Sequence, residues 1–225
     1  MKYFSLLVAA LLLVSCGGSA ENESSANLSP IMKKALYDKG SLFYADFENY
    51  PKDKSQLPIG VFDSGTGGLT VLERLLELDR FNNITGEPGA DGILDFEGED
   101  FSYLADQANM PYGNYSSEKK DDYLKELVVK DALALLSSKY AENSTEHQNP
   151  KGVKKPVKII VIACNTATSY GLQDISTLLE LSGTGVKVIG VVNAGVNAFL
   201  DVVSDTLKEN ATPAPQSGEI AVGVL

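Results

Sequence analysis

Short apolar runs alternate with helical stretches along this chain, and this alternation constrains its fold more than any other feature. Pro58-Ile59-Gly60-Val61-Phe62 is a strand signal, and the glycine-rich turn after it leads into a helix whose leucines share one face. The pattern predicts further strands at 101–104, 157–163, 186–192 and 220–225, and further helices at 118–138 and 167–181. Strands that alternate with helices make right-handed crossovers, so we expect an α/β fold with an open parallel sheet and helices on both faces.

The N-terminus has the features of an export signal. Lys2 precedes residues 4–14, which are apolar except for Ser5, and this run is too short to span a bilayer but has the length of a signal-peptide hydrophobic region. It ends in Leu13-Val14-Ser15-Cys16, which resembles the bacterial lipobox, where the cysteine is lipidated. A cleaved signal with an incidental cysteine is the alternative. We predict an exported lipoprotein, anchored through Cys16 on the periplasmic or cell-surface side.

Changes in composition divide the rest of the chain. We expect a lipoprotein signal peptide at 1–15, a tether and lead-in at 16–57, an α/β domain at 58–215 and the start of a truncated second domain at 216–225. The lead-in contains a helix within 31–50. Two polar segments interrupt the alternation at 82–100 and 141–155, and we predict that both are surface insertions.

Charge and the rarity of certain residues exclude several classes of function. The net charge is −11, from 30 acidic and 19 basic residues, and without a basic cluster the chain is not expected to bind nucleic acid. With Cys16 lipidated, Cys164 is the only free thiol, so no intrachain disulfide is expected. His147 is the only histidine, so neither a Cys/His zinc cluster nor a Ser-His-Asp triad can be assembled, and we predict no metal.

Polar residues gather where the predicted strands end. These residues are Asp63-Ser64, Pro111-Tyr112-Gly113, Cys164-Asn165-Thr166 and Asn193-Ala194-Gly195. In a parallel sheet the carboxyl ends of the strands share one edge, and ligands bind in the crevice outside it. We therefore expect these four groups to line one crevice.

Cys164 lies between a buried strand and a predicted helix N-terminus. Backbone N–H groups and the helix dipole favour a thiolate there, which could act as a base. The same N–H groups, with Asn165 and Thr166 as donors, could hold a carboxylate. Asp63, on a glycine-rich turn, could orient a thiol or accept a hydrogen bond from an ammonium group. Taken alone, however, a cysteine at a strand end is more often a small buried hydrophobic residue.

The first glycine-rich turn does not match the common nucleotide-binding motifs. Gly60 and Gly65 have the glycine spacing of a P-loop, but Thr66 stands where that motif needs lysine. The Rossmann fingerprint lacks its third glycine, because Val71 occupies that place. A phosphate-binding function is therefore not supported by this turn.

Three segments together resemble the glutamate racemases of the aspartate/glutamate racemase superfamily. They are Ile59-Gly60-Val61-Phe62-Asp63-Ser64-Gly65-Thr66-Gly67-Gly68-Leu69-Thr70-Val71-Leu72, Pro111-Tyr112-Gly113-Asn114 and Ile162-Ala163-Cys164-Asn165-Thr166-Ala167-Thr168, in that order. The resemblance implies two α/β domains that close over a small amino acid, glutamate or aspartate. It also implies that the reaction needs no cofactor and that it supplies D-glutamate for the cell wall. A homodimer is a further possibility that the resemblance implies.

The resemblance further implies roles for individual residues. Cys164 is one of two catalytic thiols, of which one removes the α-proton while the other returns a proton from the opposite face. Asp63 assists the nearby thiol. The residues that hold the substrate's carboxylate and ammonium groups are Ser64, Tyr112, Gly113, Asn165 and Thr166.

The chain departs from the family pattern in three ways. It ends at Leu225, before the second cysteine and its Cys-Thr-His motif; Asn193 stands where the family has an acidic residue; and an export signal is unusual for this family. We predict a racemase of which this chain carries only the first thiol. The alternative is a lipid-anchored, catalytically inactive protein that binds an amino acid in the same crevice.

Overall fold

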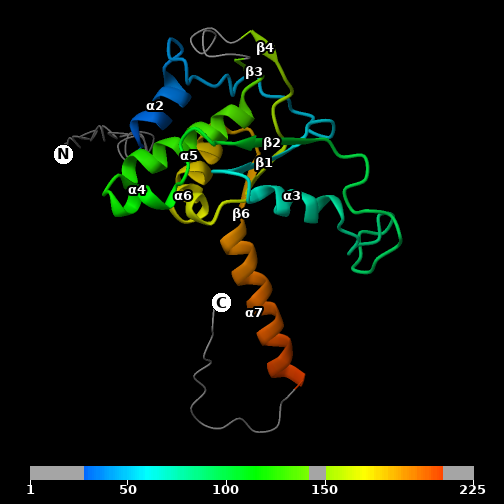
Figure 1. Cartoon of the computed structure of the whole chain (residues 1–225). Coiled ribbons are helices and arrows are strands. Elements are labelled where there is room, and N and C mark those ends of the chain that lie inside the picture. The colour runs from blue at the N-terminus through cyan, green and yellow to red at the C-terminus, as the bar shows by residue number, and fades with distance from the viewer. Residues whose placement is uncertain (1–27, 142–150, 210–225) are drawn as a thin grey trace, which may run out of the picture.

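The computed structural model describes residues 28–141 and 151–209, which form a four-stranded parallel sheet with helices packed against it (Figure 1). The strands lie in the order β2, β1, β5, β6. Their bounds are Phe101–Ala105 for β2, Ile59–Asp63 for β1, Ile159–Ile162 for β5 and Lys187–Gly190 for β6. Every neighbouring pair is parallel, so the predicted fold class is confirmed.

Three of the helices that follow the strands lie close to their predicted positions, whereas those at 113–117 and 191–209 were not predicted. After the strands come α3 (Gly68–Leu76), α4 (Gly113–Ser117), α5 (Asp121–Leu136), α6 (Asn165–Ser182) and α7 (Val191–Glu209), while α2 (Pro30–Tyr37) lies in the lead-in. Helix α6 begins two residues earlier than predicted, because Cys164 serves as its N-cap.

One face of the sheet is covered by α5 and α6, and α2 packs onto the same core. Phe62, Ile160 and Ile162 point into this core and are fully buried. The two helices approach closely at Gly171, where a β-carbon would lie 2.2 Å from Cγ1 of Val128. The core therefore depends on a small residue in the middle of α6.

The other face is less completely covered. Helix α3 packs beside β1 at Gly68, whose β-carbon would lie only 2.6 Å from the β-carbon of Asp63. Farther across the sheet, Ile189 of β6 is 45% exposed, and Leu69 on α3 is 48% exposed. The leucines of α3 share one face as predicted, but that face is largely open in the part of the chain that the structure describes.

The strand predicted at 186–192 is too long. It ends at Gly190, and Val191 and Val192 belong to α7, which extends away from the body of the molecule (Figure 1). The two valines favour a strand, but Val192, Val196 and Leu200 recur every four residues, which is the period of a helix. The strand predicted at 157–163 is likewise shorter, from Ile159 to Ile162.

The two insertions differ in structure. Residues 82–100 contain turns and no helix or strand, and the carboxylates of Asp79, Asp91 and Asp95 accept backbone N–H groups within this region. In the second insertion, β4 (Gly152–Val153) pairs with β3 (Lys139–Tyr140) as an antiparallel hairpin.

Several predictions fall on residues outside the described part of the chain. They are the signal and lipobox up to Cys16, His147, and the strand at 220–225. Within residues 28–141 and 151–209, no helix is both long enough and apolar enough to cross a membrane.

Candidate functional site

The carboxyl ends of β1 and β5 bring two of the predicted site residues together. Ser64 directly follows β1, and Cys164 follows β5 by two residues. The Ser64 hydroxyl oxygen lies 3.4 Å from the Cys164 sulfur, although the two residues are 100 positions apart in the sequence. The first and third motifs therefore meet at one point, as the parallel sheet predicted.

Two hydrogen bonds, one to its side chain and one to its backbone, hold Cys164 at the start of α6. Its sulfur accepts the backbone N–H of Ala167 at 3.4 Å, and its carbonyl accepts the Thr168 hydroxyl at 2.9 Å. The residue is a free cysteine and is 7% exposed. The sulfur therefore lies at a helix N-terminus, with a backbone N–H group already directed at it.

Asp63 is buried, and its carboxylate binds the start of α3. Oδ2 accepts the backbone N–H of Gly68 at 2.9 Å. The structure contains no hydrogen bond between Asp63 and Cys164, so assistance of the thiol by Asp63 stays a prediction. The contact explains why glycine occupies position 68, since a larger residue would collide with the aspartate.

Tyr112 points into the protein. Its side chain is 1% exposed, and its hydroxyl oxygen lies 2.6 Å from Oδ2 of Asp106 and 2.7 Å from Oδ2 of Asp131. The neighbouring Gly113 and Asn114 are exposed. Any contact of Tyr112 with a ligand in the crevice therefore falls to its backbone, because its hydroxyl is already occupied.

The two acids around Tyr112 were not among the predicted site residues. Asp106 follows β2, and Asp131 is a buried carboxyl in the middle of α5. Burial, together with the nearby charge of Asp106, raises the pKa of Asp131 to about 7, although the hydrogen bond that Tyr112 can donate to the ionised carboxylate acts in the opposite direction. Burial also raises the pKa of Tyr112. A signal was available in the sequence, since Asp131 interrupts an otherwise apolar helix face.

The remaining predicted residues lie at the starts of two helices. Asn165 and Thr166 form the first turn of α6, where Asn165 is exposed and Thr166 is partly buried. Asn193 is exposed in the first turn of α7 rather than in a loop, because the fourth strand ends earlier than predicted.

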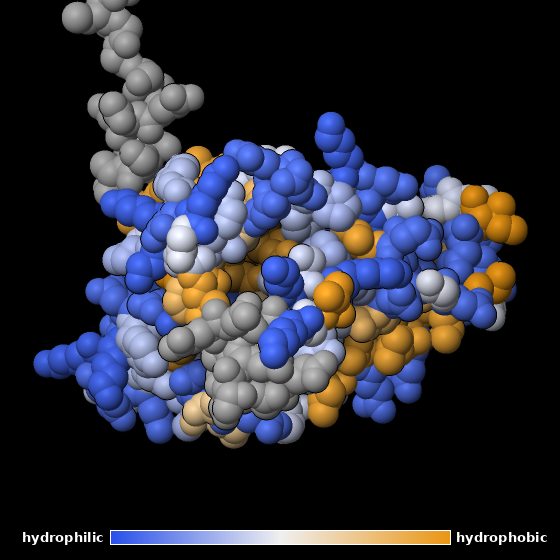
Figure 2. All heavy atoms as spheres, turned by 90° about the horizontal axis from the view of Figure 1, so that it is seen from above, coloured by the Kyte–Doolittle hydropathy of each residue, from blue (hydrophilic) through white to orange (hydrophobic). Residues whose placement is uncertain are grey.

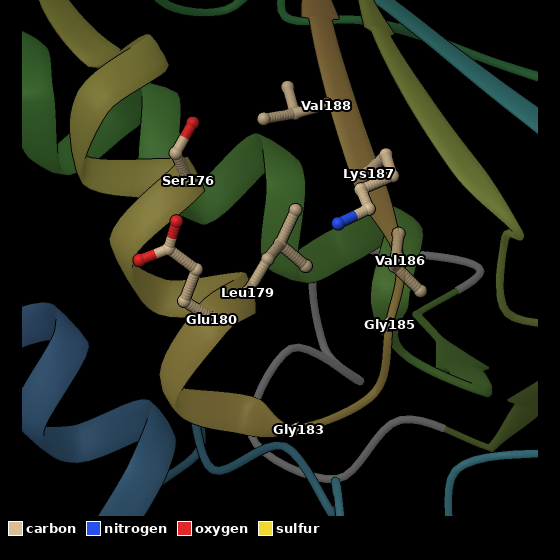
Figure 3. Close-up of a pocket in the computed structure, with 8 residues that line it drawn as sticks. All are labelled: Ser176, Leu179, Glu180, Gly183, Gly185, Val186, Lys187 and Val188. Atoms are coloured by element: carbon tan, nitrogen blue, oxygen red, sulfur yellow. The ribbon is translucent and has the colours of Figure 1, made fainter.

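Two hollows lie away from these strand ends. One, of about 370 Å³, lies between the end of α6 and the start of β6, where the Lys187 side chain extends from β6 toward α6 and Glu180 lies on α6 (Figure 3). The other, of about 700 Å³, runs along β2 beside residues 42–45 and the end of α5. Figure 2 shows hydrophobic side chains inside a hollow among mostly hydrophilic ones, on the side that faces upward in Figure 1. Neither hollow includes Ser64 or Cys164.

Metal-binding side chains do not gather at the site. Within the described ranges, no group of three or more histidine, cysteine, aspartate or glutamate side chains could hold a metal ion. The strand ends offer a thiol, a hydroxyl, carboxylates and backbone N–H groups.

Comparison with known proteins decides the family. No family model matches the chain. It is, however, 31% identical over 175 residues to a glutamate racemase from Deinococcus radiodurans, covering 78% of this chain and 46% of that protein. A glutamate racemase from Roseiflexus sp. is 30% identical over 173 residues, which is 77% of this chain and 48% of that protein. This chain belongs to the glutamate racemase superfamily.

A third relative shows the same pattern. The glutamate racemase from Lactobacillus johnsonii is 33% identical over 141 residues, covering 63% of this chain and 37% of that protein. The chain thus spans less than half the length of each of these glutamate racemases. The contact between Ser64 and Cys164 therefore lies within a racemase-like α/β fold.

Proposed function

We propose that this chain is part of an amino-acid racemase that acts on glutamate or a close acidic amino acid, with Cys164 as an acid/base group. The observation that carries the proposal is the position of the Cys164 sulfur, at the N-terminus of α6 and 3.4 Å from the Ser64 hydroxyl. The names and the similarity of the relatives support the same reaction class.

The start of α6 also offers a place for the substrate carboxylate. Backbone N–H groups in the first turn of a helix have no partner within the helix and bind anions. Asn165 and Thr166 add side-chain donors at the same place. A carboxylate bound there would bring the α-carbon of an amino acid close to Cys164.

Racemisation then needs a proton to leave one face and return to the other. The Cys164 thiolate removes the α-proton: an S–H bond forms, the C–H bond breaks, and the electron pair is delocalised into the substrate carboxyl group. The proposed scheme completes the reaction with a second thiol that donates a proton to the opposite face. The described strand ends hold one thiol, Cys164. No cofactor takes part in this scheme.

Two further elements belong to the proposal. The signal and lipobox pattern ending at Cys16 supports export and attachment to a membrane by a lipid anchor. The reaction would supply D-glutamate for the cell wall.

A second candidate function is binding of an acidic amino acid without turnover. Two observations favour it: the Asp63 carboxylate binds Gly68 rather than the thiol, and a neutral, exposed Asn193 follows the fourth strand. Such a protein would keep the carboxylate site at α6 and lose the acid/base reaction.

Exchange of the α-proton for deuterium separates the two functions. The full chain is incubated in deuterated water with each enantiomer of glutamate and aspartate, and loss of the α-proton signal is followed by NMR. The proposal predicts exchange that falls at least about 100-fold in Cys164→Ser and less in Ser64→Ala. Binding without exchange by the folded protein would favour the second candidate, and equal exchange by Cys164→Ser would contradict the role of the thiol.

A further inference from the structure

The hydroxyl of Tyr112 lies between two carboxyl groups, and only one proton belongs to it. The distances to Asp106 and Asp131 are 2.6 Å and 2.7 Å, so both contacts are hydrogen bonds. A tyrosine hydroxyl donates once and can accept, whereas an ionised carboxylate only accepts. One of the two carboxyl groups must therefore carry a proton and donate it to the tyrosine oxygen.

Asp131 is the carboxyl group that fits this role. It is 7% exposed, and it lies on α5 among residues of the apolar core. Asp106 is better supplied with donors, since the Asn109 amide donates to its two oxygens at 2.8 Å and 3.0 Å. The chain of bonds thus runs from protonated Asp131 to Tyr112 and from Tyr112 to ionised Asp106.

This chain of bonds ends at the predicted substrate site. Asp106 donates its backbone N–H to the carbonyl of Asp63 at 3.0 Å, which ties it to the end of β1. Tyr112 directly precedes the exposed backbone of Gly113. On the other side of Tyr112, the Met110 side chain lies beside Gly65, next to Ser64.

Other contacts hold the rest of α4 without involving Asp131. The Tyr115 hydroxyl donates to the carbonyl of Asn109 at 3.0 Å, and the Tyr170 hydroxyl donates to Ser116 at 2.7 Å. The segment that Asp131 holds is therefore narrow: it is the start of α4, beside the predicted substrate site.

We propose that Asp131 is a positioning residue that, in its protonated form, holds residues 110–114 in place through Tyr112 and so shapes the ligand site. The proposal rests on the function proposed above. Loss of the proton from Asp131 would leave two negative carboxylates around one hydroxyl, which cannot donate to both. The segment would then loosen, and the affinity for an acidic amino acid would fall as the pH rises.

Few other groups near Asp131 could make the ligand affinity depend on pH in this way. Tyr112 and Asp106 are the groups that act on its charge. Its neighbour on α5, Lys130, pairs with Glu126 at 2.6 Å and lies over the Phe43 ring. The elements α2 and α6, which also pack on α5, contribute apolar residues to the same core, and Asp174 of α6 lies near Lys125 and Asp122 of α5 rather than near Asp131.

The first test follows the segment of residues 110–114 directly, without a ligand. The backbone amide resonances of Gly113 and Asn114 are recorded by NMR from pH 5 to 9. In the wild-type chain they should shift with a midpoint near the Asp131 pKa of about 7. In Asp131→Asn, whose amide donates to Tyr112 but does not titrate, they should stay constant.

A matched control is available on α6. Burial also raises the pKa of Asp174, which lies outside the Tyr112 network. Asp174→Asn should therefore leave the titration of Gly113 unchanged. A wild-type Gly113 that does not titrate, or one that still titrates in Asp131→Asn, would overturn the proposal.

The second test measures binding of glutamate by calorimetry across the same pH range. The wild-type Kd should rise by roughly three- to ten-fold between pH 6 and 8, the size expected for loss of one hydrogen bond, and the Kd of Asp131→Asn should stay constant. A pH-independent wild-type Kd would overturn the role of Asp131 in ligand binding. If Gly113 titrates as expected but no acidic amino acid binds at any pH, the proposed function fails while the positioning of the loop by Asp131 stands.

Discussion

The two faces of the sheet differ in how fully they are covered. Helices α5 and α6 cover one face, and the core there contains the fully buried Phe62, Ile160 and Ile162. On the other side, α3 packs closely only near β1, and Leu69 and Ile189 remain about half exposed. The stability of the fold therefore comes mainly from the α5/α6 face, whereas the ligand site depends on the strand ends, where both faces meet.

Truncating a leucine on each side should give the largest contrast. Leu178 of α6 is fully buried, so Leu178→Ala should lower the free energy of unfolding by about 2–5 kcal/mol. Leu69→Ala on the open side of α3 should cost less than about 1 kcal/mol, since that side chain is half exposed. Urea unfolding followed by circular dichroism measures both. Equal losses would mean that the open side is covered in solution.

The pH dependence of stability should be the next largest effect. Because folding raises the pKa of Asp131 to about 7, the folded state holds this proton more tightly than the unfolded state. The stabilisation is complete at acid pH and is lost as the pH rises toward 7, at about 1.4 kcal/mol per pH unit. Above pH 7 this contribution should stay constant.

The measurement is the difference in unfolding free energy between the wild-type chain and Asp131→Asn from pH 5 to 8. The unfolding free energy of the wild-type chain minus that of the variant should fall as the pH rises to about 7 and then level off. A difference that is constant over the whole range would show that Asp131 is already ionised in the folded state.

Two glycine-to-alanine substitutions should change the free energy of unfolding by smaller amounts and in opposite directions. In Gly171→Ala the new β-carbon would collide with Val128, so we expect a loss of about 1–3 kcal/mol. In Gly195→Ala on α7 nothing lies within 4 Å, and the better helix propensity should add up to about 1 kcal/mol. Thermal unfolding of both variants compares them, and a stabilising Gly171→Ala would contradict the close packing of α5 on α6.

The sequence predicted most of the sheet because its signals are local. The apolar run before Asp63 and the β-branched run before Cys164 each end at polar residues, and the parallel topology brings these residues together. The end of the fourth strand was missed, since Val191 and Val192 favour a strand until the helical period of the following residues is considered.

The inward orientation of Tyr112 could not be predicted in the same way. It depends on two acids that lie 6 residues before it and 19 residues after it, on different elements. Only the packing of α5 against the start of α4 brings Asp131 to the tyrosine. Contacts of this kind are set by tertiary structure and leave only a weak mark in the sequence, here a carboxyl group among apolar residues.

Protection of Cys164 from modification tests the location of the ligand site most directly. The rate at which methyl methanethiosulfonate modifies Cys164 is followed by mass spectrometry of the peptide that contains it, with and without glutamate. We predict that one or both enantiomers of glutamate slow the reaction at Cys164, while an uncharged amide analogue at the same concentration does not. Modification at the same rate at saturating glutamate, by a folded protein that binds it, would contradict a ligand site at Cys164.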